Sequence, residues 1–260
     1  MATSFGALCT DFYINAKLAV KMDMPGERET VLHFFDRVRK SVPSMNRFRR
    51  YDGELALESG RSDAEYQWLA LRRNCLRTGH VNPDSMDAAS AFHKLMLELA
   101  PFHLTLSPLD VDYLEVLFGF DLECEDRDHD DVVYEALYAD TALGNVARPL
   151  DEDPQGRRTY KITKVLDVQP IFGVQLDDPG NTQAYFEVKT RPRNRRGKAS
   201  KNGEPISLFL TARRYGPCDS LDHLGAWYGG LAQTCQTLCE DRLIPDLLTP
   251  ISRLITSGSA

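Results

Sequence analysis

The sequence lacks any long hydrophobic run, and this absence excludes one class of protein at once. No window approaches about 18 uninterrupted apolar residues, so no membrane-spanning helix is predicted. The opening residues, MATSFGALCTDFY, do not combine a basic segment with an apolar run and so do not resemble a signal peptide. The 6 cysteines are scattered, mostly among apolar neighbours, as is typical of reduced thiols. We therefore expect a cytoplasmic protein without a membrane partner.

Catalytic signatures are missing as well. The patterns GxxxxGK[ST], GxSxG and GxGxxG are absent, which argues against the common nucleotide-binding and hydrolase sites. His103-Leu104-Thr105 matches one H-x-T unit of the two-histidine phosphoesterases, but the second unit that the acid–base pair needs is absent. The sequence therefore predicts no catalytic residue and no cofactor, and it favours a protein that is not an enzyme. An enzyme with a site at the junction of two halves, near His103, Asp110 and Asp112, stays open as an alternative.

Residues 119–138, GFDLECEDRDHDDVVYEALY, crowd acidic side chains around a histidine and resemble a metal site at first sight. A calcium loop needs glycine and glutamate where this sequence has Asp131 and Leu137. Neighbours in sequence point apart on a helix, so the acids next to His129 do not converge with it. We predict no metal site here, and expect Asp128 to cap a helix instead.

Two cysteines of the last predicted helix, Cys235 and Cys239, stand four residues apart, so their sulfur atoms can share one helix face. No second His or Cys pair accompanies them at zinc-binding spacing. We therefore expect buried thiols and no metal ligands.

Composition and charge are those of an ordinary globular protein. The chain has 260 residues, of which 42% are hydrophobic and 27% are charged, so it can bury a core of normal size. The net charge of −7 argues against a protein that coats nucleic acid over its whole surface.

One basic segment stands out against this acidic background. Its Lys and Arg side chains lie between two apolar strands, in a connection rich in Pro, Gly, Ser and Asn. Guanidinium and ammonium groups suit phosphate oxygens, so the segment is a candidate anion- or nucleic-acid-binding site. A solvated hairpin loop, or a loop that docks on an acidic patch of a second subunit, is the competing interpretation. The candidate residues are Lys189, Arg191, Arg193, Arg195, Arg196, Lys198 and Lys201.

Hydrophobic periodicity predicts an internal duplication. In the first half, alternation predicts a strand over 12–24, followed by a helix, a hairpin formed by 51–59 and 66–76, and a second helix capped by Ser85. The same order returns about 100 residues later, with an extra strand over 158–176 and a long final helix. We predict an α+β fold of two fused ferredoxin-like βαββα repeats, at 1–105 and 106–260, with antiparallel sheets covered by helices.

The duplication suggests how the halves meet. If their first strands are neighbours, Lys17 and Lys21 are expected to face Asp121 and Glu123 across the sheet, at about 0.2–1 kcal/mol per opposed pair.

Three functional hypotheses remain. The first and favoured one is a non-enzymatic interaction or structural protein, a homo-oligomer or a protein with another protein partner, that uses its open sheet face or its basic loop. The second is a phosphate- or nucleic-acid-binding module that uses 189–201, and the third is the junction enzyme described above.

Overall fold

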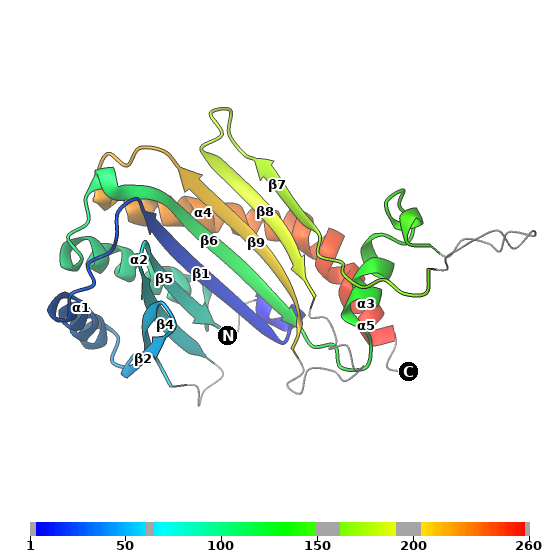
Figure 1. Ribbon diagram of the computed structural model, residues 1–260, viewed down its shortest axis with the longest axis horizontal. Coiled ribbons are helices and arrows are strands. Elements are labelled where there is room, and N and C mark those ends of the chain that lie inside the picture. Colours follow the sequence, from blue (N-terminus) through cyan, green and yellow to red (C-terminus); the bar gives the residue numbers. More distant parts are fainter. Residues whose placement is uncertain (1–3, 61–64, 149–161, 191–203, 258–260) are drawn as a thin grey trace, which may run out of the picture. The chain divides into compact units, whose positions relative to one another are not determined.

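The computed structural model describes residues 4–60, 65–148, 162–190 and 204–257, and Figure 1 shows how its elements follow one another. The strands are β1 (Asp11–Val20), β2 (Arg47–Tyr51), β3 (Glu54–Glu58), β4 (Tyr66–Arg72), β5 (Cys75–Val81), β6 (Val111–Leu122), β7 (Ile171–Gln175), β8 (Thr182–Lys189) and β9 (Ile206–Tyr215). The α-helices are α1 (Arg28–Ser41), α2 (Met86–His103), α3 (His129–Leu137), α4 (Leu224–Leu238) and α5 (Thr249–Ser257). A π-helical stretch, Cys239–Leu248, connects α4 to α5.

The strands form one large antiparallel sheet, so the fold is α+β, as the sequence predicted. Their order is β2-β3-β4-β5-β1-β6-β9-β8-β7. The two strands that open the predicted halves, β1 and β6, are therefore neighbours in the sheet. The pairing of β1 with β5 places Ile14 opposite His80 and Ala16 opposite Thr78.

The first half has four strands after α1, where the sequence analysis predicted two. Each predicted strand of the hairpin is divided by a two-residue turn, at Asp52-Gly53 and at Arg73-Asn74. Gly53 has φ +67°, which a glycine adopts without the steric cost that a side chain brings. The predicted βαββ order was therefore wrong for this half, because the turns are too short to interrupt the apolar pattern.

The predicted strand over 158–176 was too long. Within the described residues only Ile171–Gln175 is a strand, β7. The Val168 amide donates to the Asp130 carboxylate (3.1 Å), and Pro170 has no N–H to donate to a sheet. The Val168 amide is therefore not available for strand pairing, and Pro170 pairs only through its carbonyl, which accepts from the Val188 amide of β8 (2.9 Å).

The chain divides into two compact units. Unit 1 comprises 1–120, 173–185 and 209–238, and unit 2 comprises 121–172, 186–208 and 239–260. The division into domains at 1–105 and 106–260 that the sequence predicts is a different one, and it stays a prediction.

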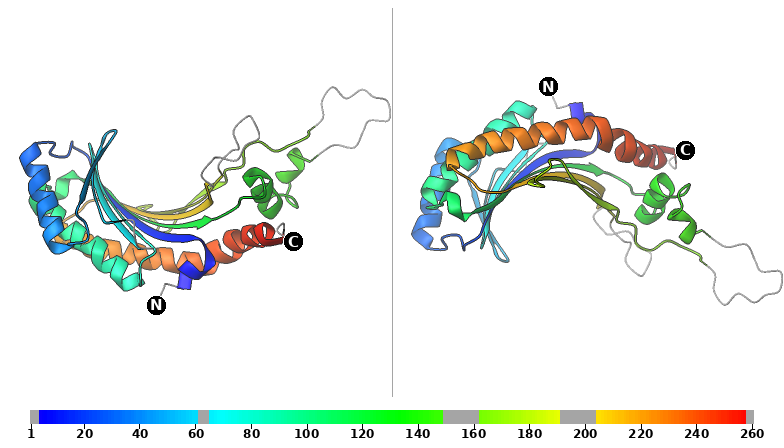
Figure 2. Two further views of the ribbon diagram at one scale, coloured as in Figure 1. Left: turned by 90° about the horizontal axis from the view of Figure 1, so that it is seen from below. Right: turned by 90° about the horizontal axis from the view of Figure 1, so that it is seen from above.

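Unit 1 has an aromatic core on one face of its strands. The rings of Phe5, Phe12, Phe118 and Phe120 lie 5.1–6.2 Å apart, and all four side chains are buried. Helices α2 and α4 lie over this face (Figure 2). The α2 helix begins as predicted, because the Ser85 hydroxyl accepts a hydrogen bond from the Ala88 amide (3.1 Å).

Strand β7 is an edge strand with apolar side chains in solvent. Ile171 is 62% exposed and Phe172 is 65% exposed, and Val174 is exposed as well. The segment from Ile171 to Leu176 carries no charge. It thus lacks the lysines and prolines that usually protect an edge.

Candidate binding face

The opposite face of the unit 1 strands carries no helix of that unit among the described residues (Figure 2), and we call it the open face. Side chains alternate along a strand, so the residues between the core positions of β1, Tyr13 and Lys17 among them, point to this face. Register and side-chain contacts place aromatic and charged residues of the other strands beside them. Its members include Tyr13, Lys17, Arg47, Arg49, Tyr51, Glu54, Glu58, Tyr66, Trp68, Arg72, Arg77, Tyr113, Glu115, Tyr185, Arg213 and Tyr215.

Two glycines let aromatic rings lie flat on this face. A Cβ atom on Gly79 would be 2.1 Å from the Trp68 indole nitrogen, and one on Gly119 would be 2.2 Å from the Tyr13 ring. Any larger residue at either position therefore forces the ring away. The absence of a side chain at these positions fixes how Trp68 and Tyr13 are presented.

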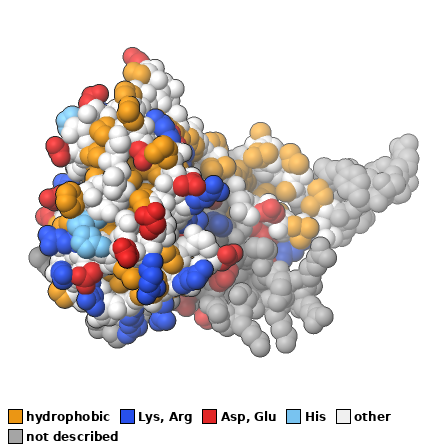
Figure 3. Space-filling model, turned by 60° about the vertical axis from the view of Figure 1, so that its left-hand side comes forward, with side chains coloured by type: hydrophobic (Ala, Val, Ile, Leu, Met, Phe, Trp, Pro, Cys, Tyr) orange, Lys and Arg blue, Asp and Glu red, His pale blue; other side chains and the backbone are white. Residues whose placement is uncertain are grey.

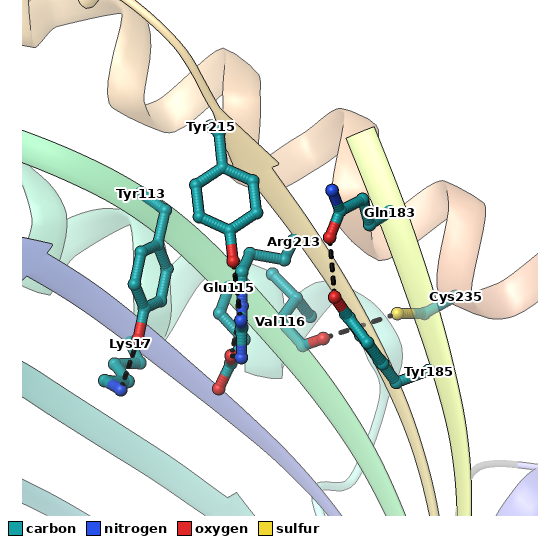
Figure 4. A network of polar contacts seen from close by, with 9 residues as sticks. All are labelled: Lys17, Tyr113, Glu115, Val116, Gln183, Tyr185, Arg213, Tyr215 and Cys235. Atoms are coloured by element: carbon teal, nitrogen blue, oxygen red, sulfur yellow. Dashed lines mark hydrogen bonds and ion pairs between the residues drawn. The ribbon is translucent and has the colours of Figure 1, made fainter. Parts of the chain in front are cut away.

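Arg213 is the centre of a cluster in which a guanidinium is held by tyrosines and a glutamate (Figure 4). Its Nε and Nη2 atoms donate to Glu115 Oε2 at 2.8 and 2.5 Å, and Nη1 donates to the Tyr215 hydroxyl at 2.7 Å. The guanidinium carbon is 4.6 Å from the ring centroid of Tyr113 and 5.4 Å from that of Tyr185. Burial by itself lowers the pKa of Arg213, but the bonds to Tyr215 and Glu115 outweigh it and raise the pKa. The arginine is therefore a fixed, permanently charged part of the face.

Lys17 joins this cluster from β1. Its Nζ atom donates to the Tyr113 hydroxyl (2.5 Å) and lies 5.0 Å from that ring's centroid. Lys21 Nζ donates to the Leu109 carbonyl (3.3 Å). The prediction that the first strands of the two halves, β1 and β6, are neighbours is confirmed. The predicted pairing of these lysines with Asp121 and Glu123 was wrong. Because β1 and β6 run antiparallel, the lysines meet the beginning of β6 and not its end.

A hollow of about 430 Å³ lies on the open face over β3 and β4. It is lined by Tyr51, Asp52, Glu54, Ala56, Glu58, Tyr66, Trp68, Arg72 and Arg77. Its volume falls in the range of roughly 300–1,000 Å³ that is usual for sites that bind small molecules.

Two buried histidines lie on the other, helix-covered face. Thr78 Oγ1 and His93 Nδ1 are 2.7 Å apart, and His80 Nε2 contacts Glu65 Oε1. Burial lowers the pKa of His93 to about 3, with repulsion from His80 acting in the same direction. Burial lowers the pKa of His80 too, against the opposing effect of Glu65. Near neutral pH, His93 is an uncharged partner of Thr78 in the core.

The residues that were candidates for an enzyme at the junction of two halves take separate roles. The His103 ring contacts the His33 ring at 5.0 Å between centroids, and burial followed by repulsion from His33 lowers the pKa of His103. The Asp110 carboxylate accepts a hydrogen bond from the Met22 amide (3.1 Å) beyond the end of β1. These contacts do not form an acid–base pair.

The acidic stretch at 119–138 lies in unit 2 from Asp121 onward and organises the backbone of that unit. The Asp128 carboxylate caps α3 as predicted, accepting from the Asp130 amide (3.1 Å) and pairing with Lys164 (2.6 Å). Asp130 is buried and accepts from the Thr190 hydroxyl (2.7 Å), and His129 Nε2 lies 3.1 Å from the Cys124 carbonyl. Within the described ranges, no group of three or more His, Cys, Asp or Glu residues is arranged to hold a metal ion.

The basic segment falls almost entirely outside the described residues. Lys189 is described, at the exposed end of β8, whereas Arg191, Arg193, Arg195, Arg196, Lys198 and Lys201 are not. Its role as an anion- or nucleic-acid-binding site therefore stays a prediction.

Sequence reasoning missed the open face, although a local signal existed. Tyr13, Trp68 and Tyr113 occupy the polar positions of amphipathic strands, where a plain solvated face carries short polar or charged residues.

The prediction that the two thiols near the C-terminus are buried is confirmed. Cys235 and Cys239 are buried, and the chain's cysteines form no disulfide.

Comparisons with known proteins add no family. No family model matches the chain, and no curated protein does. Among solved structures it is similar to the crystal structure of the di-domain ARO/CYC StfQ from the steffimycin biosynthetic pathway, with 11% identity over 94% of this chain and 97% of that chain. The TM-score is 0.19, which is too low to carry a conclusion about fold or function. None of the described helices combines the length and the apolar character needed to cross a membrane.

Proposed function

We propose that the protein is a non-enzymatic interaction protein that binds its partner through the open face of the sheet. The observation that carries this proposal is the gathering of aromatic rings and guanidinium groups on the face of unit 1 that its helices leave bare. Tyrosine, tryptophan and arginine are the residues most enriched in the centres of protein interfaces.

The face is also organised before binding. Arg213 is held by Glu115 and three tyrosines, and Trp68 lies on a glycine. Side chains that are already fixed lose less conformational entropy when a partner covers them, so more of the contact energy becomes affinity. A merely solvated sheet face has no need of such order.

The chemistry of the described residues supports a binding role over a catalytic one. His93, a deeply buried histidine, is uncharged and bonded in the core, and the acids at 128 and 130 hold backbone and side-chain donors. A catalytic group needs a pKa near the operating pH and access to substrate. Figure 3 shows charges of both signs among hydrophobic side chains on one side of the molecule, a surface suited to a mixed interface.

The experiment compares matched charge reversals on the two sides of unit 1. Tagged wild-type protein, Lys17→Glu and Lys94→Glu are expressed in the native host and purified after mild cross-linking; Lys94 is exposed on α2. We expect a partner that Lys94→Glu retains and that Lys17→Glu recovers at least fivefold less, measured by quantitative mass spectrometry. Hydrogen exchange should then slow in β1 and β6 of the complex. Equal recovery by the two variants, or protection confined to α2, contradicts the proposal. A second copy of the chain is one partner that this experiment identifies, through the mass of the complex.

A second candidate function follows from the composition of 189–201, which holds 7 Lys and Arg residues. If the segment binds nucleic acid through phosphates, affinity for a duplex should fall by roughly 0.9 log units per contacted phosphate for each tenfold rise in salt. An affinity that does not depend on salt concentration, or no binding at low salt, would contradict this second candidate function.

We also infer that the two halves are repeats of one unit. In each half a strand and a helix precede a set of antiparallel strands whose last member returns beside the first, β5 beside β1 and β9 beside β6. This arrangement is an extended form of the ferredoxin-like unit. The inference predicts matching registers for the β1–β5 and β6–β9 pairs, which cross-strand NMR contacts measure; unrelated registers contradict it.

A further inference from the structure

The hollow on the open face forms where small side chains of β3 and β4 lie between rows of large ones. Ala56 and Ala70 are paired across β3 and β4, and both are buried. The rows that flank this pair hold Glu58 opposite Trp68 at one end, and Glu54 and Arg72 at the other. The alternation of small and large residues on one face thus makes a walled depression with charged groups at both ends.

The two glutamates of the hollow differ in their partners. Glu54 accepts from Arg72 Nε (2.5 Å) and from Arg77 Nη1 (3.4 Å), so its charge is neutralised within the protein. Glu58 is only 7% exposed and accepts from the Tyr51 hydroxyl (2.7 Å). Within the described part of the chain, Glu58 forms no ion pair with a lysine or arginine. Because a buried carboxylate without a counter-ion is costly, the charge of Glu58 is available to a bound cation.

Aromatic rings border the Glu58 carboxylate, with Trp68 opposite it and the Tyr51 hydroxyl reaching it from the Glu54 end of the hollow. Tyr51, Tyr66 and Trp68 line it together with Glu58. The faces of such rings attract cations, and a carboxylate behind them adds to the attraction. The wall already holds one cation of the protein itself, because the Arg77 guanidinium lies 5.4 Å from the Trp68 ring centroid.

The charge balance of the lining selects the sign of the ligand. The hollow has three carboxylates, Asp52, Glu54 and Glu58, and two guanidiniums, Arg72 and Arg77, both bound to Glu54. Three carboxylates against two guanidiniums leave a net charge of −1; at the Trp68 end the lining charge is that of Glu58, whereas Asp52, Glu54 and the two arginines lie at the other end. At the Trp68 end a cation is attracted by Glu58, whereas an anion is repelled by the same carboxylate.

We propose that the hollow binds an organic ammonium group, with its charge against Glu58 and its methyl or methylene carbons against Tyr51, Tyr66 and Trp68. This assignment deepens the proposed function, because it rests on the open face being a binding surface and names the chemistry that one part of it recognises. The ammonium group is either that of a free amine or quaternary ammonium compound, or that of a lysine or methyl-lysine side chain in a protein partner.

Two exposed arginines on this face can compete with the ligand, Arg49 opposite Ala56 and Arg47 opposite Glu58, and Arg47 is the one in the row of Glu58. It is paired with Glu58 across β2 and β3, but its side chain is exposed and makes no ion pair with Glu58. Replacing it with glutamine removes a repelling charge from the mouth of the hollow. The proposal therefore requires that Arg47→Gln bind an ammonium probe at least as tightly as the wild type does.

The experiment uses the indole N–H signals of the purified protein. The chain has 2 tryptophans, so the buried Trp227 signal is assigned by Trp227→Phe and Trp68 remains as the reporter. The probes are tetramethylammonium, the amide of Nα-acetyl-trimethyllysine, and the neutral isostere 2,2-dimethylpropanol. We expect a saturable shift of the Trp68 signal with one or both cations, at a Kd on the order of 1 mM, and at least tenfold weaker binding of the neutral compound. Which cation binds more tightly identifies the source of the ammonium group.

Matched variants decide whether Glu58 carries the binding. Glu58→Gln should weaken binding at least tenfold, whereas Glu98→Gln, the same change at an exposed position of α2, should leave affinity within about twofold. Tyr66→Leu keeps the carboxylate and should weaken binding about fivefold, which tests the aromatic wall if Glu58→Gln does not fold.

Three results would overturn the proposal: equal binding of the neutral isostere, unchanged affinity in Glu58→Gln, or no saturable shift with either cation. None of them affects the proposed function, because partner capture depends on Lys17 at the other cluster and this titration uses no partner. Conversely, the hollow can bind the cations while the Lys17→Glu variant retains its partner. That result would support the ammonium site and contradict the proposed protein interface.

Discussion

The two faces of the unit 1 strands use the same aromatic residues in opposite ways. On the covered face, the buried rings of Phe5, Phe12, Phe118 and Phe120 pack against one another. On the open face, tyrosine and tryptophan rings are matched with the charges of Lys17, Arg77 and Arg213. Strands that alternate in this way present a hydrophobic core to the helices and a fixed polar surface to solvent.

The difference indicates which face stabilises the fold and which face is free to bind. Burial of the phenylalanines removes large apolar areas from water and dominates the free energy of unfolding. Half-exposed ion pairs and cation–π contacts contribute far less, because water already solvates their charges. Substitutions on the covered face should therefore act on stability, and substitutions on the open face should act on recognition.

The largest expected effect is at Phe118, which is fully buried and touches Phe5 and Phe12. Phe118→Ala should lower the free energy of unfolding by about 3–5 kcal/mol, because it leaves a cavity in the core. Urea denaturation followed by circular dichroism measures the change. Tyr113→Ala, an aromatic truncation on the open face of the same strand, should cost less than half as much. Equal losses from the two variants would erase the proposed division between the faces.

The next effect depends on pH and concerns His93. The pKa of His93 is lowered to about 3 in the folded protein, whereas an unfolded histidine has a pKa of about 6.5. The unfolded state binds the proton first, so the stability that neutral His93 provides is complete above about pH 6.5 and is lost as the pH falls toward 3. Between about pH 7 and pH 5 this group should lower the free energy of unfolding by about 2 kcal/mol.

Urea titrations of the wild type and His93→Gln at those two pH values isolate this contribution, because the other titrating groups cancel in the difference. The variant should show the shallower dependence on pH. Parallel curves would mean that His93 is not held neutral in the core.

A smaller effect is expected from the ion pair of Glu115 and Arg213. A double-mutant cycle with Glu115→Gln and Arg213→Met should give a coupling energy of about 1–2 kcal/mol, since two guanidinium nitrogens donate to one carboxylate oxygen and tyrosines partly shield the pair. Thermal and urea denaturation of the four proteins measure it. A coupling energy near zero would mean that the Glu115–Arg213 pair contributes no more to stability than an ordinary exposed ion pair does.

The smallest effect should come from Lys17, which contributes one hydrogen bond and one cation–π contact to Tyr113. Lys17→Gln should change the free energy of unfolding by no more than about 0.5 kcal/mol. Its effect on partner recovery should be the larger one. A loss of stability as great as that of Phe118→Ala would show that the open face supports the fold after all.

The strands and helices with strong periodicity were predictable from the sequence. Alternation located β1, β6, β8 and β9, and the cap at Ser85 located the start of α2. Two-residue turns escaped detection, because a tight hairpin hardly interrupts an apolar pattern. The strand predicted over 158–176 was too long; the Val168 amide within it donates to the side chain of Asp130, which is 38 positions away in the sequence.

The candidate site was not predictable in the same way. Lys17 meets Tyr113 across 96 positions of the chain, and Glu115 meets Arg213 across 98. Sequence reasoning selected 189–201 instead, because its basic residues are dense locally. Chemistry that is assembled across strands becomes visible only when the strand order and register are known.

The uncharged edge of β7 has a consequence for how the protein must be handled. Among the described strands β7 has a neighbour on one side only, so its outer edge, beside the exposed Ile171 and Phe172, can pair with another extended chain. In dilute buffer the net charge of −7 keeps molecules apart, but at about 1 M salt the screening length shrinks to about 3 Å. Colloidal stability should therefore be greatest at low ionic strength, and concentrated stocks should turn cloudy as salt is added.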